Sequence, residues 1–378
     1  MIWMSKVPKP LKGLGPKIIL GAFIIIICFS WLLWIFLEKF VDTENHENRE
    51  MAAQPCLTLD NYGTFSEEYE RYFNDNIPFR NNLTTLNSSI DYFIFNRSAN
   101  PCVIVGDDNW LFYNNTNGGD PVGAYKGTNL LSDEQLQEIA QNCLAQRDFL
   151  AAQGKEFVIF IAPNKERIYS EYMPRWYGKP ADNYQALQVV NYLRENTDLR
   201  VVYPYEELME AKQNTDYNIY SKTDTHWNYI GGYIGASALL RELGIELPDI
   251  TDNRTEITVG DKTSGDLAEM LNLSDQLTFA DRLYTVSGYD THNMQVVEEN
   301  FFNVFSYTAE NADLRKIYIV RDSFSSHMRE YIGSQFKESY LRHIDTYTYE
   351  DFVNQDPDIL VYETVERYVD GLGSFSIQ

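Results

Sequence analysis

Two short segments of the chain contain the side chains of a nucleophilic serine site. They read TDTHW at residues 223–227 and VRDSF at residues 320–324, where the second segment ends an apolar run. Together they supply a hydroxyl, an imidazole and a carboxylate, the groups that convert a serine oxygen into a nucleophile. Because Asp224 lies two residues from His226, its carboxylate can reach Nδ1 and leave Nε2 for Ser323. These three residues are therefore candidates for a catalytic triad.

Each segment also has a purely structural interpretation. An Asp-Ser pair at the start of a helix is an ordinary N-cap, and residues 223–226 also fit a capping turn. Trp227 is a candidate platform for a sugar ring, although a tryptophan is more often a core residue. His327 follows Ser323 by one helical turn and is an alternative base.

The elements that would position these groups alternate along the chain from residue 131 onward. Residues 157–162 are apolar on both faces, as in a central strand that is covered on each side. Further strands are expected at 201–205, 316–320, 340–344 and 358–362, and helices at 131–150, 184–193, 230–243 and 324–336. This alternation predicts an α/β fold with a mostly parallel sheet flanked by helices. Both candidate segments then lie in loops at one edge of the sheet, and the backbone N–H of Ser323 is expected near a helix N-terminus, where it can stabilise an oxyanion.

Between about residues 260 and 311 the pattern changes to short alternating pieces. Alternation of this kind is typical of antiparallel strands. We expect a small antiparallel insertion here that forms a wall of the binding site.

The N-terminal part predicts a membrane anchor. Residues 18–37 form an uncharged apolar run that is long enough to cross a bilayer, and four lysines precede it. We expect a cytosolic tail at 1–17, a transmembrane helix at 18–37, a stalk at 38–60 and an extracellular domain at 61–378. A cleaved signal peptide is the alternative, but the run is longer than a usual signal core and no small-x-small site follows closely.

Charge and cysteine content exclude several classes of function. The formal net charge is −24, although the first 17 residues carry four lysines and no acidic residue. Such a surface repels phosphate backbones, which argues against a nucleic-acid partner. The five histidines and four cysteines show no metal-ligand spacing, and we expect neither a metal nor a cofactor. Cys56 and Cys102 are left open as a disulfide pair.

The DTHW and DSF motifs resemble those of the SGNH-hydrolase-like domain of AlgJ/AlgX-type (DHHW-type) polysaccharide O-acetylation proteins. Residues 72–80, 162–165 and 264–267 are similar to recurrent stretches of the same family, so the likeness runs from about residue 62 to the C-terminus. The resemblance implies a Ser-His-Asp triad carried by Ser323, His226 and Asp224.

The order of the motifs is reversed relative to ordinary SGNH hydrolases, which a circular permutation explains. The strand before Ser323 is then the first, 340–344 the second, 358–362 the third, 157–162 the fourth and 201–205 the fifth. The chain departs from the family pattern at two places: Arg321 replaces a glycine, and Glu363-Thr364 replaces the oxyanion asparagine.

A second oxyanion donor is therefore needed. The candidates for binding the oxyanion or the substrate are Asn164, Arg80 and a neighbouring backbone N–H.

The resemblance implies a membrane-anchored extracellular O-acyltransferase, most simply an O-acetyltransferase of a cell-surface polysaccharide or wall polymer. A single helix cannot carry acetyl groups across a membrane, so a multi-spanning partner of the membrane-bound O-acyltransferase kind is expected as the acyl source. Two alternatives stay open. One is an esterase that uses the same triad, and the other is a non-catalytic polysaccharide-binding scaffold.

Overall fold

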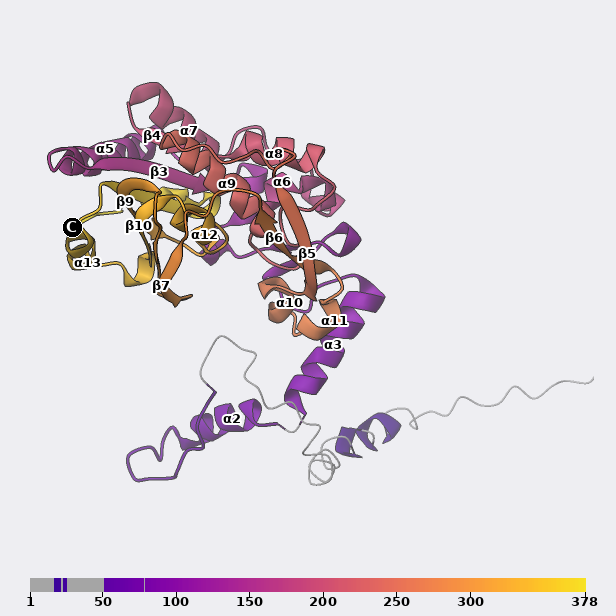
Figure 1. Cartoon of the computed structure of the whole chain (residues 1–378). Helices are drawn as coiled ribbons and strands as arrows, with labels where there is room; N and C mark the ends of the chain where they lie inside the picture. Colours follow the sequence, from indigo (N-terminus) through magenta and orange to yellow (C-terminus); the bar gives the residue numbers. More distant parts are fainter. Residues whose placement is uncertain (1–16, 22, 26–50, 78) are drawn as a thin grey trace, which may run out of the picture. The chain divides into compact units, whose positions relative to one another are not determined.

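The computed structural model of the chain describes residues 17–21, 23–25, 51–77 and 79–378 (Figure 1). It contains two compact units, residues 1–94 and 95–378, which are considered separately. The predicted tail at 1–17 and span at 18–37 fall mostly outside the described residues. Within the described ranges, no helix combines the length and the apolar character that crossing a bilayer requires.

Helices α2 Phe65–Asp75 and α3 Arg80–Phe95 and the helical residues 17–21 and 23–25 belong to the first unit, apart from the last residue of α3, and the strands of the described residues belong to the second. The other helices are α4 Pro121–Lys126, α5 Asp133–Ala151, α6 Lys165–Ile168, α7 Gln185–Asn196, α8 Tyr205–Asn214, α9 Tyr229–Glu242, α10 Asp266–Met270, α11 Ser274–Leu277, α12 Arg329–Gly333 and α13 Tyr349–Gln355. The strands are β1 Val103–Val105, β2 Leu111–Tyr113, β3 Glu156–Ala162, β4 Arg200–Val202, β5 Glu256–Thr263, β6 Asp281–Ser287, β7 Gln295–Asn300, β8 Val304–Thr308, β9 Asp313–Arg321, β10 Phe336–His343 and β11 Ile359–Val365.

The central sheet has seven strands in the order β4-β3-β11-β9-β10-β8-β7. The first five are parallel, and β8 and β7 are antiparallel to their neighbours. When β9 is counted as the first strand, as the permutation requires, the parallel part has the order 2-1-3-4-5. This is the flavodoxin-like doubly wound order, so the observed sheet agrees with the predicted permutation.

The central strands bury both faces, which explains their continuous apolar sequence. In β3, Val158, Phe160 and Ala162 point into one core, and Phe157, Ile159 and Ile161 point into the other. Helices α8, α9 and α12 contribute to the first core, while α5, α7 and α13 contribute to the second. The predicted α/β architecture is therefore a sheet between two helical layers (Figure 1).

Local sequence signals account for the helix before β3. Ser132 caps α5 in a capping box with Gln135, and Gly154 follows the helix with a φ of 72°. The strand predicted at 201–205 ends at Val202, because Pro204 has no N–H to donate to a ladder, and Pro204 instead precedes α8, which begins at Tyr205.

The region predicted as one insertion at 260–311 divides between two sheets. Strands β5 and β6 form a separate antiparallel pair, whereas β7 and β8 extend the central sheet beside β10. The helix predicted at 324–336 is also interrupted. A 3₁₀ turn at Phe324–His327 comes first, and α12 ends at Gly333 before β10 begins. The carbonyl of Phe324 accepts a hydrogen bond from the Trp227 indole, so it is used in a tertiary contact.

The first unit includes residues 61–94, which the sequence analysis assigned to the outer domain. The helix α2 has no buried residue, and residues 51–60 of the predicted stalk contain neither helix nor strand. The Asp75 carboxylate accepts a hydrogen bond from the backbone N–H of Ala52 (2.8 Å). Cys56 and Cys102, which the sequence left open as a pair, are both free thiols, as is Cys143.

Candidate functional site

The two sequence motifs meet at the carboxyl edge of the parallel strands. Ser323 follows β9 by two residues, and the segment 220–228 precedes α9. A bridge between Tyr220 and Trp227 closes this segment into a compact loop. The indole of Trp227 donates to the carbonyl of Phe324 (2.9 Å), which ties the loop to the residue after the serine.

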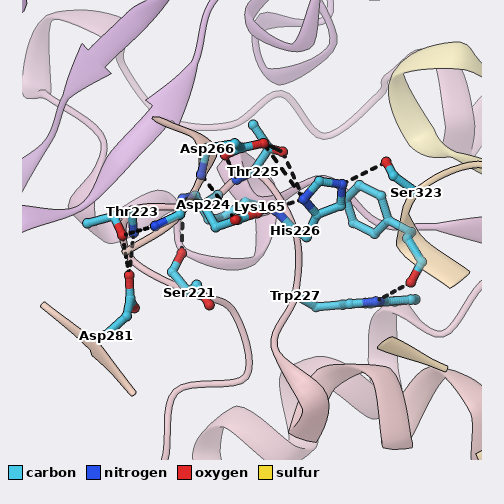
Figure 2. A network of polar contacts seen from close by, with 12 residues as sticks. Lys165, Ser221, Thr223, Asp224, Thr225, His226, Trp227, Asp266, Asp281 and Ser323 are labelled. Carbon is cyan, nitrogen blue, oxygen red and sulfur yellow. Dashed lines mark hydrogen bonds and ion pairs between the residues drawn. The ribbon is translucent and has the colours of Figure 1, made fainter. Parts of the chain in front are cut away.

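Three side chains form a continuous hydrogen-bonded chain across this junction. The Nε2 of His226 lies 2.7 Å from Ser323 Oγ, and its Nδ1 lies 2.6 Å from Asp224 Oδ1 (Figure 2). Asp224 Oδ1 also accepts the backbone N–H of His226 (2.9 Å), which fixes the carboxylate against the ring. This is the geometry in which an imidazole takes the serine proton while a carboxylate holds the tautomer.

The electrostatics of the pair favour a charged imidazole. Burial alone would raise the pKa of Asp224, but the charge of His226 and the hydrogen bonds from it outweigh burial and hold this pKa well below its ordinary value. Burial alone would lower the pKa of His226, but the Asp224 carboxylate outweighs it and raises this pKa. The site therefore stabilises the imidazolium that forms when the serine loses its proton.

A second carboxylate, Asp266 at the start of α10, lies on the same side of the ring. Its Oδ2 is 3.7 Å from His226 Nδ1 and accepts a hydrogen bond from Thr225 Oγ1 (2.5 Å). Burial and the nearby Asp224 charge raise the pKa of Asp266. Asp224, His226 and Asp266 each offer an atom within 4.8 Å of the others, so a cation could be held here. However, Nδ1 already contacts Asp224, and both Asp266 oxygens accept hydrogen bonds from Thr225.

The glycine before Asp266 is required by close packing. A Cβ on Gly265 would overlap the side chain and backbone of Asp224. The backbone N–H of Asp266 also donates to Asp224 Oδ2 (3.2 Å). The segment that begins at Gly265 therefore supports the second oxygen of the triad carboxylate.

A buried lysine supports the same loop from the other side. The Lys165 ammonium donates to the backbone carbonyls of Ser221 (3.1 Å), Lys222 (3.2 Å) and Asp224 (2.5 Å). Burial lowers the pKa of Lys165, an effect that the surrounding carboxylates oppose. Asp281 of β6 accepts hydrogen bonds from the backbone of Lys222 and from Thr223.

The loop that carries Ser323 is held by two acids. Asp322 accepts hydrogen bonds from the backbone N–H groups of Phe324 (2.8 Å) and Val365 (2.7 Å). Glu363 Oε2 accepts from the Asp322 N–H and from Ser325 Oγ, both at 2.8 Å. Burial raises the pKa of Glu363 well above its ordinary value, and the adjacent Asp322 carboxylate raises it further.

The two departures from the family pattern therefore occupy neighbouring buried positions. Arg321 is fully buried and donates to the carbonyls of Asp322 (3.1 Å) and Phe301 (2.8 Å). Burial lowers its pKa to about 10, so it stays charged at neutral pH. Glu363 binds the serine loop in the place expected for the oxyanion asparagine.

The other predicted site residues have different outcomes. Trp227 is completely buried, as the core interpretation expected, so it is not available as the candidate sugar platform, and its role is the packing and hydrogen bond described above. Asn164 is 1% exposed, and its Nδ2 has no hydrogen-bond partner among the described residues. Asn164 stays a candidate oxyanion donor. Arg80 begins α3 in the first unit and stays a prediction.

The structure corrects the helix that was expected after Ser323 and decides between the two candidate bases. Ser323 precedes a four-residue 3₁₀ turn, not the helix that was predicted, so the dipole of a full helix does not act on its N–H. His327, the alternative base, has a ring centroid 6.2 Å from that of His226, and burial lowers its pKa to about 4. His226 is the imidazole that contacts Ser323.

The sequence analysis missed the roles of Lys165, Asp266 and Glu363. All three lie in segments that it had singled out: the first two in stretches similar to the related family, and Glu363 as a departure from that family's pattern. The available signal was therefore the position of these polar residues in the segments that resemble the family or depart from its pattern.

Comparisons with known proteins agree with this fold. Residues 103–328 match the family model described as SGNH hydrolase-like domain, acetyltransferase AlgX. A probable alginate O-acetylase AlgJ from Azotobacter vinelandii is 27% identical over 329 residues, which cover 81% of this chain and 79% of that protein. The AlgJ of Pseudomonas fluorescens is 28% identical over 216 residues, and this match spans about half the length of both proteins (56% and 51%).

Two solved structures share the fold of this chain. PatB1 of Bacillus cereus superimposes with a TM-score of 0.52 at 18% identity and covers 72% of this chain and 99% of that one. A DHHW family protein from Eubacterium siraeum gives a TM-score of 0.51 at 14% identity, with 72% and 98% covered. At these identities the likeness concerns the fold alone.

Proposed function

The chain belongs to the family of the SGNH hydrolase-like domain of the acetyltransferase AlgX, and from this premise we propose that it is a polysaccharide O-acetyltransferase that works through an acyl-Ser323 intermediate. The supporting observation is the hydrogen-bonded chain from Asp224 through His226 to Ser323 Oγ, at 2.6 and 2.7 Å. The AlgJ relatives, named as probable alginate O-acetylases, support an acyl transfer to a polysaccharide. The polymer itself is not specified by these observations.

In the first half-reaction the enzyme takes an acetyl group from a donor. His226 Nε2 removes the proton from Ser323 Oγ, and the oxygen attacks the acetyl carbonyl to form a tetrahedral intermediate. The intermediate collapses to the acyl-serine ester, and the imidazolium returns the proton to the leaving group. Asp224 stabilises the imidazolium throughout.

In the second half-reaction the acetyl group passes to the polymer. His226 Nε2 removes the proton from a sugar hydroxyl, whose oxygen attacks the acyl-serine carbonyl. Collapse of the second intermediate forms the sugar ester, and Ser323 recovers its proton from His226. Water in place of the sugar would give hydrolysis, so the acceptor must exclude water from the acyl-enzyme.

We extend the proposal to the location of the enzyme and its acyl source. The apolar run at 18–37 and the lysines before it support a single-pass anchor with an extracellular catalytic unit. An extracellular active site has no direct access to cytosolic acyl-CoA, so a multi-spanning membrane-bound O-acyltransferase would deliver the acetyl group.

Replacement of Ser323 by alanine tests the proposal. In cells that carry Ser323→Ala, we expect the O-acetyl content of the surface polysaccharide to fall to background and labelling by a fluorophosphonate probe to disappear. Ser326→Ala is the matched control, because Ser326 Oγ is buried close by and has no hydrogen-bond partner among the described residues. Unchanged acetylation in the Ser323 variant would refute the proposed role.

A hydrolysis assay and the labelling of the wild-type protein separate the two alternatives. Fast hydrolysis of an aryl acetate by the full-length protein, with no change when sugar acceptors are added, would assign an esterase. Absence of fluorophosphonate labelling in the wild-type protein would assign a non-catalytic scaffold. The complete hydrogen-bonded chain supports a functional nucleophile.

A further inference from the structure

A pocket of about 170 Å³ lies beside the triad. Asp224 and His327 border it on one side, and the antiparallel pair β5 and β6 forms another wall. Ser323 does not border this pocket. The pocket is therefore a neighbour of the reaction centre, since Asp224 contacts His226 directly and the ring of His327 lies 6.2 Å from that of His226.

Several polar side chains in the walls of the pocket form no hydrogen bond or ion pair with the described residues. Across the described ranges, no hydrogen-bond or ion-pair partner exists for the side chains of Ser221, Ser264, Arg282, Tyr284 and His327, all of which border the pocket. The Nδ1 of His327 is buried as well as unpartnered. Buried polar groups in folded proteins are normally satisfied, so the unpartnered Nδ1 of His327 is unusual. Arg282 is exposed and the other three side chains are half-buried, so all four are accessible to a ligand in the pocket.

The nearby acids, in contrast, are already occupied. Asp281 accepts three hydrogen bonds from the triad loop, and Asp224 accepts its own from His226. The groups left for a ligand are three hydroxyls, one guanidinium and one imidazole. Burial lowers the pKa of His327 to about 4, so this imidazole is neutral at physiological pH. Such a mixture of donors and acceptors suits the hydroxyls of a sugar.

The size of the pocket limits what it holds. Sites for drug-sized ligands usually occupy roughly 300–1,000 Å³, so a pocket of about 170 Å³ accepts one ring and not two. We propose that this pocket is an acceptor subsite, which holds the sugar ring next to the ring whose hydroxyl reaches Ser323. The proposal rests on the proposed function and adds the position of the polymer.

The strand β6 would then select the acceptor. Arg282 and Tyr284 lie two residues apart on β6, so both side chains project from the same face of the strand. The sequence of this antiparallel pair would decide which sugar is bound, while the triad carries out the transfer.

The experiment separates acylation from acceptor binding. Full-length Arg282→Gln/Tyr284→Phe is introduced into cells, and two quantities are measured: fluorophosphonate labelling of Ser323 and O-acetyl content of the surface polysaccharide. We expect normal labelling and at least about tenfold less acetylation, because the acyl-enzyme still forms but the acceptor is bound poorly. Tyr284→Phe alone, which removes one hydroxyl and no packing, should give a smaller decrease in the same direction.

Lys262→Gln is the matched control. Lys262 is exposed, faces Arg282 in the ladder between β5 and β6, and does not border the pocket. It should change neither quantity. Normal acetylation in both pocket variants would overturn the subsite, even if Ser323→Ala abolishes acetylation. Persistent acetylation in Ser323→Ala would instead overturn the proposed function, so the two failures are distinguishable.

Discussion

The ammonium of Lys165 lies 2.5 Å from the backbone carbonyl oxygen of Asp224. It also donates to the carbonyls of the two residues that begin the same loop, at 3.1 and 3.2 Å. One side chain that follows β3 thus fixes the backbone of a loop almost sixty residues later in the chain. The position of the triad carboxylate depends on this contact, because Asp224 and His226 belong to the loop that Lys165 holds.

Lys165→Met should therefore reduce both stability and catalysis. Methionine keeps much of the volume but leaves three buried carbonyls without their donor, which costs on the order of 3 kcal/mol of unfolding free energy. The loop would lose its fixed geometry, so the rate of acylation should fall as well. Chemical denaturation and fluorophosphonate labelling rates measure the two effects.

Lys316→Met provides the comparison. Lys316 forms a partly exposed ion pair with Glu338 (2.9 Å), so its loss should cost less than about 1 kcal/mol and leave labelling unchanged. Equal effects of the two variants would show that the three carbonyls do not depend on Lys165.

Glu363 offers a test of protonation under the serine loop. Burial and the adjacent Asp322 carboxylate raise the pKa of Glu363 and so disfavour its charged form, and a glutamine has nearly the same shape and the same accepting oxygen. Glu363→Gln should therefore change the unfolding free energy by less than about 1 kcal/mol and keep Ser323 reactive. Glu363→Ala should cost about 3 kcal/mol, because the Asp322 N–H and the Ser325 hydroxyl lose their acceptor.

Denaturation curves and fluorophosphonate labelling of both variants show whether the fold requires the charged form of Glu363. If glutamine were as damaging as alanine, the carboxylate form would be the one that the fold requires. The negative charge of Glu363 would then contribute to holding the serine loop, close to the buried guanidinium of Arg321.

Much of the fold could be predicted because it depends on strong local signals, and the triad could be predicted because its motifs resemble those of a known family. The apolar strand at 157–162 and the capping box at Ser132 indicate the alternation of helices and strands, and the resemblance of the DTHW and DSF motifs predicted that Ser323 meets His226. The parallel strand order then follows from the permutation.

The remaining features depend on contacts between distant segments. Nothing in the local sequence distinguishes β7 and β8, which join the central sheet, from β5 and β6, which do not. The burial of Trp227 could not be predicted from its neighbours in the sequence, because it results from packing against Phe324, which lies 97 residues further along the chain. The loop contacts of Lys165 and Glu363 arise in the same way.

Gly265 allows a test of packing behind the triad carboxylate. Its backbone has an ordinary φ of −115°, so alanine is permitted by the backbone but would overlap Asp224. Gly265→Ala should displace Asp224 and lower the acylation rate by about a hundredfold, the cost of misplacing a reacting group by about 1 Å. Gly260→Ala on β5 is the control, since its added methyl would meet Leu283 at 3.3 Å and no triad residue. Comparable labelling rates in the two variants would contradict the requirement for glycine.

Asp266 should set the pH at which the triad becomes active. Its negative charge helps to raise the pKa of His226, and only neutral His226 can accept the proton of Ser323. Asp266→Asn removes that charge, so the pKa of His226 falls and the acid limb of the labelling rate should move to lower pH by up to about one unit. Asparagine still offers an acceptor to Thr225, so the loop should keep its shape. The control Asp261→Asn, an exposed position on β5, should leave the profile in place. An unchanged pH profile would mean that Asp266 carries no charge in the active enzyme and does not raise the pKa of His226.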